Sequence, residues 1–167
     1  DVVVQRLVRV VSFEFNEKVE FSYVANIPEE KEAIEVVYDA LNIELEEGRL
    51  LDENDRRKVI LGNEYKSDDL GKEIRLGKTV KIQGESFEVI GFLKKAGTFI
   101  LNGAIIMPDK DMRDILDIGD EYDILIVQVK DSKNVEDVKA TIERKIRDDR
   151  DLDLGEEDFS VQTPQQG

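Results

Sequence analysis

The chain has 167 residues and a formal net charge of −15, from 39 acidic residues against 24 basic ones. A surface this acidic repels nucleic-acid phosphates and anionic lipid head groups, so no nucleic acid is expected among its partners. The absence of Cys and His excludes disulfides, thiolate and imidazole metal sites, and every catalytic triad that uses histidine. The length suits one domain, or two small lobes, with a real core.

Membrane and targeting segments are not evident. No window of the sequence approaches the ~20 apolar residues of a membrane helix, and no signal peptide is visible. Asp1 rather than Met stands first. We therefore expect the chain to be a piece of a longer protein, such as a soluble segment of a membrane protein.

The first forty residues predict strands followed by a helix. Residues 2–11 are rich in β-branched side chains, and apolar and polar residues then alternate from Phe13 to Tyr23 around a turn at residues 16–18. This pattern is typical of a β-hairpin. Pro28 then opens a helical stripe, with Pro at the first helical position.

The middle of the chain, residues 46–117, is rich in turns and dominated by strands. Its pattern predicts a buried strand ending at Gly62, a short helix ending at Gly71, a hairpin at residues 77–93 and a short helix after Pro108. The loop of the hairpin is expected at Gln83–Ser86, which makes this exposed turn a better contact candidate than the glycines around it.

The end of the chain predicts strand, helix and strand at residues 122–131, 135–149 and 159–164. Asn134 is suited to cap the helix, and this order fits a split ferredoxin-like unit. We predict an α+β fold with two lobes, in which the middle of the chain is inserted between the two halves of an α/β lobe.

Two acidic stretches approximate a calcium-binding loop without completing it. Residues 52–56 begin with Asp and Asn at ligand spacing, but Arg56 stands at the third position. Residues 149–153 have the spacing of the first three ligands, but Leu154 replaces the required Gly and Ser160 the required Glu. No metal or other cofactor is expected.

Other chemistry has little support in the sequence. There is no GxGxxG and no GxxxxGK[ST] loop for a nucleotide. Paired carboxylates can run a hydrolase, but nothing selects one pair among 39 acids. Phe87, Phe92 and Phe99 are interpreted as core, with a lipid or peptide groove as the alternative. We expect no catalytic residue.

Five stretches in order resemble a known family. They are GRLLDENDRRKVILGNEYKSDD, LGKTVKIQGESFEVIGFLKKAG, AIIMPDKD, YDILIVQVKDSKNVEDVKATIERKI and DFSVQTPQQ. Their order and spacing resemble the extracytoplasmic domain of MacB-type ABC transporter permeases, a family that includes LolC/LolE and FtsX-like permeases. The resemblance covers residues 26–166. The signature positions that carry it are Gly48, Arg49, Gly62, Gly77, Gly84, Phe87, Gly91 and Pro108.

The resemblance implies a two-lobed domain on the extracytoplasmic side of the cell membrane, between the first two membrane helices of a permease. Residues 1–45 and 118–167 would form a porter-like lobe, and residues 46–117 an inserted, mostly β Sabre-like lobe. The domain itself would be non-catalytic. It would transmit motion driven by a separate cytoplasmic ATPase and pair with a second permease protomer. It would also contact an exported substrate, which is a peptide, a lipoprotein or a small molecule. The alternative is a stand-alone peptide- or lipid-binding module.

The sequence departs from the family at its start. Family members have another strand and helix before the region that matches residues 2–11. We expect this part of the porter-like lobe to be truncated or supplied by a partner. The compact middle of the chain also suggests that no outer-membrane tunnel partner binds it.

Overall fold

The computed structural model describes residues 2–67, 70–96 and 99–128. The fold is mixed α+β, as the sequence predicts. The chain divides into two compact units, residues 3–126 and residues 1–2 with 127–167. The first unit is described below. The helix predicted at residues 135–149 and the strand predicted at residues 159–164 lie outside the described residues.

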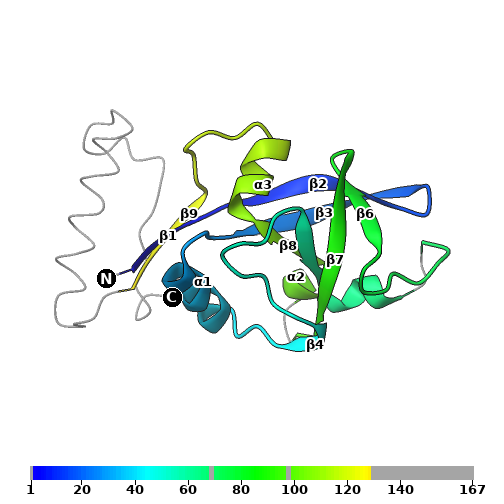
Figure 1. Ribbon diagram of the computed structural model, residues 1–167, viewed down its shortest axis with the longest axis horizontal. Helices are drawn as coiled ribbons and strands as arrows, with labels where there is room; N and C mark the ends of the chain where they lie inside the picture. The colour runs from blue at the N-terminus through cyan, green and yellow to red at the C-terminus, as the bar shows by residue number, and fades with distance from the viewer. Residues whose placement is uncertain (1, 68–69, 97–98, 129–167) are drawn as a thin grey trace. The chain divides into compact units, whose positions relative to one another are not determined.

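Strands dominate the described part of the chain (Figure 1). They are β1 (Val2–Arg6), β2 (Val8–Phe15), β3 (Lys18–Ile27), β4 (Leu45–Gly48), β5 (Lys58–Leu61), β6 (Thr79–Ile82), β7 (Glu85–Leu93), β8 (Ala104–Pro108) and β9 (Ile124–Gln128). The helices are α1 (Lys31–Ala40), α2 (Phe99–Asn102), α3 (Asp109–Ile115) and the 3₁₀ helix η1 (Asn63–Lys66).

Six strands close into a barrel. Their order is β7-β5-β8-β3-β2-β6, and β6 also pairs with β7, so the ring ends where it began. The closure depends on β6, which pairs with β7 over four residues and with β2 at Phe13↔Ile82 and Glu14↔Lys81. Strand β4 pairs with the last residues of β7, outside the ring. Strands β1 and β9 form a separate two-stranded ribbon.

One apolar cluster fills the barrel, because every second residue of each strand points inward. Its largest fully buried side chains are Phe13 on β2 and Phe87 and Phe92 on β7, each at most 1% exposed. The prediction that Phe87 and Phe92 belong to the core is confirmed. Tyr65 on η1 packs into the cluster from outside the sheet, with its ring centroid 4.9 Å from that of Phe13.

The hairpin of β2 and β3 is confirmed, but its buried face is not the more apolar one. Val19, Phe21 and Tyr23 are all more than half exposed, whereas Ser22 and Asn26 are buried. The Ser22 hydroxyl and the Asn26 amide both have hydrogen-bond partners inside the fold, which removes the penalty for burying them. The apolar row of β3 is therefore left on the outer surface of the barrel.

The predicted helix after Pro28 exists as α1, which begins at Lys31 rather than at the proline. Ala33, Ile34 and Val37 form its buried stripe. The hydroxyl of Tyr38 donates to the carbonyl oxygen of Leu51 and accepts from its N–H, at 3.1 and 3.0 Å. This pair of bonds fixes the helix to the loop after β4.

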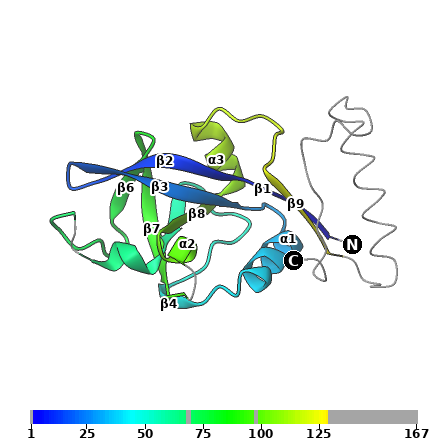
Figure 2. The ribbon, with the colours of Figure 1, turned by 180° about the vertical axis from the view of Figure 1, so that it is seen from behind.

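The hairpin predicted at residues 77–93 is formed by β6 and β7 (Figure 2). Its turn has two residues, Gln83 and Gly84, both with positive φ, as in the primed turns that suit the twist of a hairpin. The predicted loop was wider, since Glu85 and Ser86 already belong to β7. The short helix predicted to end at Gly71 is also shorter, because η1 stops at Lys66.

The proposed division into a porter-like and a Sabre-like lobe stays a prediction. Much of the porter-like lobe, residues 129–167, lies outside the described residues. Strands β2 and β3, assigned to that lobe, share one closed sheet with β5 to β8 of the middle of the chain. A lobe boundary therefore cannot follow the edge of this sheet.

Two glycines allow β4 to lie against β7. Gly48 and Gly91 are register partners, and Gly48 has a φ of +81°. A Cβ on Gly48 would overlap the carbonyl oxygen of Ile90, and a Cβ on Gly91 would lie 2.8 Å from that of Arg49. Both neighbours are backbone atoms, so a side chain would force the strands apart.

We expect Gly91→Ala to lower the free energy of unfolding by about 1–3 kcal/mol, because the added methyl group overpacks this contact. Chemical denaturation of the chain measures the change. Gly119→Ala is the control, since a Cβ there meets nothing within 4 Å. The explanation is wrong if both variants change stability by the same amount.

Candidate functional site

Within the described residues, no group of three or more acidic side chains is placed to hold a metal ion. The first calcium candidate is a loop in which a carboxylate oxygen of Asp52 accepts a hydrogen bond from the Asn54 N–H at 3.0 Å. This bond is typical of an Asx turn. The second candidate, residues 149–160, lies outside the described residues.

Arg49 of the family signature forms a bidentate ion pair with Asp55, with two N···O distances of 2.8 Å. Asp55 is 5% exposed and also accepts the N–H of Asp52 at 2.8 Å. The hydrogen bonds from Arg49, opposed by burial and aided by the Asp52 N–H, lower the pKa of Asp55 to about 2. The pair closes the loop between β4 and β5.

Arg57 joins the β6–β7 hairpin to α3. Its backbone has a φ of +52°, and its guanidinium lies 5.4 Å from the ring centroid of Phe87. One guanidinium nitrogen lies 2.9 Å from a carboxylate oxygen of Asp114, and the backbone N–H donates to Asp111 at 2.7 Å. Phe87, another signature position, is therefore covered by a cation that lies within 3.6 Å of three carboxylates, those of Glu85, Asp111 and Asp114.

The other signature positions lie at turns and close approaches. Gly62 has no room for a Cβ, which would overlap the carbonyl oxygen of Asn102. Gly77 and Gly84 have φ values of +85° and +79° in turns, and Pro108 ends β8 at the N-cap of α3. We propose that the eight signature positions serve the scaffold, because none of them converges on a cavity.

The junction between the barrel and the β1–β9 ribbon is a polar cluster, which we call the ribbon root. Its members are Gln5, Leu7, Asn26, Asp109, Arg113 and Asp123. Asn26 is fully buried at its centre. Its carbonyl oxygen accepts the Leu7 N–H at 2.8 Å, while its amide group donates to the backbone oxygen of Gln5 at 2.9 Å and to Asp109 at 2.6 Å. One side chain thus holds the kink between β1 and β2 and the start of α3.

Charged residues complete the ribbon root. Asp123, next to β9, accepts the Val8 N–H at 2.9 Å and the guanidinium of Arg9 at 2.9 and 3.0 Å. Arg113 donates to Asp109 at 2.9 Å and to the backbone oxygen of Glu121 at 2.7 Å. The segment that enters the barrel and the segment that leaves it are therefore fixed to the same point.

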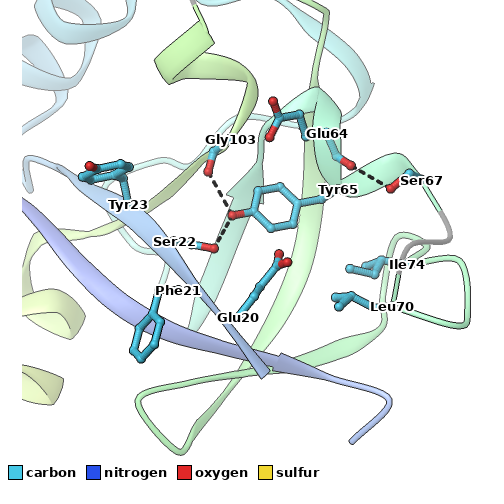
Figure 3. Close-up of a pocket in the computed structure, with 10 residues that line it drawn as sticks. All are labelled: Glu20, Phe21, Ser22, Tyr23, Glu64, Tyr65, Ser67, Leu70, Ile74 and Gly103. Carbon is cyan, nitrogen blue, oxygen red and sulfur yellow. Dashed lines mark hydrogen bonds between the residues drawn. The ribbon is translucent and has the colours of Figure 1, made fainter. Parts of the chain in front are cut away.

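A cavity of about 290 Å³ opens beside β3. It lies between β3 and the η1 region, and its lining residues are Glu20, Phe21, Ser22, Tyr23, Glu64, Tyr65, Ser67, Leu70, Ile74 and Gly103 (Figure 3). At its floor the hydroxyl of Tyr65 lies 2.6 Å from the Ser22 hydroxyl and 2.9 Å from the carbonyl oxygen of Gly103. The carbonyl can only accept, so Tyr65 donates to it and Ser22 donates to Tyr65.

The cavity is negatively charged. Burial is the main cause that raises the pKa of Tyr65, to about 12, and the charges of Glu20 and Glu64 add to the increase. In the part of the chain that the structure describes, neither glutamate forms a salt bridge. Tyr65 therefore stays protonated between two carboxylates that lack a cation.

The family model of the MacB-like periplasmic core domain matches residues 3–145, most of the chain. The chain belongs to this family. It is the extracytoplasmic domain of an ABC transporter permease of the MacB type, as the resemblance implied. None of the described helices is long and apolar enough to cross a membrane.

Relatives of this MacB-like domain agree with the assignment. An uncharacterized ABC transporter permease of Methanocaldococcus jannaschii is 29% identical over 161 residues, covering 92% of this chain and 37% of that protein. The chain thus spans about a third of the relative's length. The extracellular domain of the noncanonic ABC-type transporter YknZ from Gram-positive bacteria has a TM-score of 0.72 at 21% identity, covering 90% of this chain and 76% of that one.

The periplasmic region of MacB from Actinobacillus actinomycetemcomitans has a TM-score of 0.71 at 19% identity, covering 91% of this chain and 68% of that one. At these identities the two structures show a shared fold. The match to a permease domain disfavours the alternative of a stand-alone binding module.

Sequence reasoning did not find the ribbon root or the cavity. Asn26 interrupts an apolar run between Val24 and Ile27, and a polar residue inside such a run is a usable signal for a buried hydrogen-bond centre. Arg113 lies among charged residues of α3 and gives no comparable signal. Tyr65 lies in the short helix that the sequence predicts before Gly71, and nothing in the pattern marks it as a core residue.

The Arg49–Asp55 pair predicts a pH dependence of stability. The pKa of Asp55 is lower in the folded chain than in the unfolded one, so its contribution is complete above about pH 4 and is lost as the pH falls towards 2. We expect Asp55→Asn to lower the free energy of unfolding by about 2 kcal/mol at pH 7, with a difference from the wild type that shrinks below pH ~4.

Urea unfolding of both chains across this pH range measures the difference. Glu53→Gln is the matched control, because Glu53 is exposed on the same loop and makes no hydrogen bond or ion pair among the described residues. A difference that does not vary with pH would contradict the assignment.

Proposed function

We propose that the domain transmits ATP-driven motion of the permease's membrane helices to its extracytoplasmic surface, without chemistry of its own. The observation that carries the proposal is the ribbon root. The chain enters the barrel through β1 and leaves it before β9, and these strands pair with each other. A displacement of the ribbon therefore reaches the barrel at a single site.

The ribbon root is suited to carry such a displacement because its bonds are buried or charge-assisted. Hydrogen bonds to ionised groups are shorter and stronger than those between neutral groups. Asn26, on β3, bonds to the kink between β1 and β2 and to the start of α3, and Arg113 bonds α3 to the linker that leads to β9. Without these side chains the ribbon would pivot on the kink at Leu7.

The barrel is suited to move as a rigid body, because its closed sheet surrounds one packed cluster. Packed cores resist deformation and pass displacement on. We propose that the ATPase resides on a separate cytoplasmic chain or domain, that two permease protomers assemble, and that their extracytoplasmic domains move relative to each other. The exported substrate would be a peptide, a lipoprotein or a small molecule.

The test uses the full-length permease with its ATPase. Glu88→Cys places a spin label on the exposed side of β7, away from the ribbon root. Pulsed electron paramagnetic resonance then measures distances between the labels of two protomers with and without ATP. We expect an ATP-dependent shift in the wild type, and a broader distribution with a smaller shift in Arg113→Gln, which loses the bonds to Asp109 and Glu121.

Arg75→Gln is the control, because Arg75 is exposed and its ion pair reaches only Glu73, two residues away. We expect it to behave as the wild type does. An unlabelled sample checks that each variant keeps its ATPase activity and its thermal unfolding midpoint. An unchanged shift in Arg113→Gln would remove the ribbon root from the pathway, and no shift in the wild type would overturn the proposed motion.

A further inference from the structure

The barrel leaves one stretch of strand edge open. Strand β3 has ten residues, but its parallel partner β8 has five and begins at the pair Tyr23↔Ala104. In the described part of the chain, residues 18–22 of β3 pair only with β2. The side of β3 that faces away from β2 is therefore a free edge over this stretch, and the cavity lies along it.

The register shows which backbone groups the edge presents. Ser12 is the partner of Phe21, yet its N–H donates to the Gln83 side chain at 2.7 Å and its carbonyl accepts from the Gln83 N–H at 3.0 Å. Ser12 and Phe21 thus form the pair type whose backbone bonds point outward. Phe21, and Val19 two residues before it, direct their N–H and C=O groups to the open edge.

The side chains of the edge alternate between two environments. Residues 20–23 all border the cavity. Ser22 is buried beside Tyr65, whereas Val19, Phe21 and Tyr23 are 58%, 81% and 54% exposed. Figure 3 shows Phe21 directed away from the Tyr65 ring, while Glu20 and Glu64 lie on either side of it. A strand added here would place alternate side chains in the acidic cavity and against the apolar row.

We propose that the open edge of β3 binds an extended basic peptide by strand addition, with a Lys or Arg side chain between Glu20 and Glu64 and apolar side chains on Phe21 and Tyr23. Charge complementarity selects this occupant, because both carboxylates lack a cation and the whole chain has a net charge of −15. The main chain supplies affinity through Val19 and Phe21, and the alternation of side chains supplies specificity.

The inference rests on the proposed function in one respect: it identifies the substrate contacted by the domain as a basic polypeptide. Binding to the edge and motion at the ribbon root are separate properties of different residues. A chain that binds the peptide while Arg113→Gln leaves the ATP-driven shift unchanged would support the site and contradict the transmission. A chain that does not bind the peptide, while Arg113→Gln reduces the ATP-driven shift, would contradict the site and leave the transmission supported.

The experiment titrates the 167-residue chain with acetylated and amidated Lys-Val-Lys-Val-Lys-Val, followed by calorimetry and by amide resonances of Val19 and Phe21. A peptide with the same side chains, N-methylated at alternate residues, keeps the charge but cannot donate to the edge. We expect the N-methylated peptide to bind about tenfold more weakly, from the loss of two hydrogen bonds. Glu-Val-Glu-Val-Glu-Val should not bind.

Two protein variants test the same groups from the other side. Glu20→Gln with Glu64→Gln should weaken the lysine peptide about tenfold by removing both charges from the cavity. Phe21→Pro removes the outward N–H while leaving the β2 ladder complete, and should abolish binding. If Phe21→Pro fails to fold, the N-methylated peptide still tests the backbone contact. Glu73→Gln, in an exposed ion pair outside this cavity, is the control.

Equal binding of the methylated and unmethylated peptides would overturn strand addition. Equal binding of the lysine peptide to the wild type and to the Glu20→Gln, Glu64→Gln variant would overturn the assignment of the cavity as a pocket for a basic side chain. Sedimentation of the chain without peptide gives the third outcome: self-association that Phe21→Pro removes, with no peptide binding, would assign the edge to a second copy and reject the peptide.

Discussion

The fold depends on the closure of the sheet by β6. This strand of four residues pairs with β7 on one side and β2 on the other, so two hairpins distant in sequence enclose a single apolar cluster. Closure removes the sheet edges that would otherwise be free. In the described residues two interruptions of the ring matter: the ribbon root, where the chain enters and leaves, and the open stretch of β3, where β8 is too short to cover it.

These two features differ in character. Polar side chains concentrate at the ribbon root, where Asn26 is buried and Arg113 and Asp123 form charge-assisted bonds to backbone groups. A geometry fixed in this way suits the proposed transmission of movement. The edge of β3 has the opposite character, with unpaired carboxylates and an exposed apolar row. The family signature lies at neither place, since its glycines and Arg49 hold turns and strand contacts of the barrel.

Local patterns predicted local structure well. The alternation around residues 16–18 predicted the β2–β3 hairpin, and Gly84 predicted the turn between β6 and β7. Pairings across the chain were not predicted, because nothing in residues 23–27 indicates that they lie parallel to residues 104–108. The buried face of β3 could not be predicted either. Hydrophobicity favours burial of Phe21, but the structure buries Ser22 and Asn26, whose side chains form hydrogen bonds inside the fold. The order of the sequence motifs identified the family. The open edge of β3 could be found only from the register of its pairing with β2 and β8.

The central claim is that barrel and ribbon root behave as one rigid body, and native-state amide hydrogen exchange tests it most directly. The amides of Leu7 and Asp123, bonded at 2.8 Å to Asn26 and to the Arg6 carbonyl oxygen, belong to the root. The amide of Val89, which donates to the carbonyl oxygen of Lys78 at 2.9 Å, belongs to the barrel. We predict that all three exchange only through global unfolding, with equal opening free energies. Much faster exchange of Leu7 and Asp123 than of Val89 would show that the root opens locally, and would contradict rigid transmission.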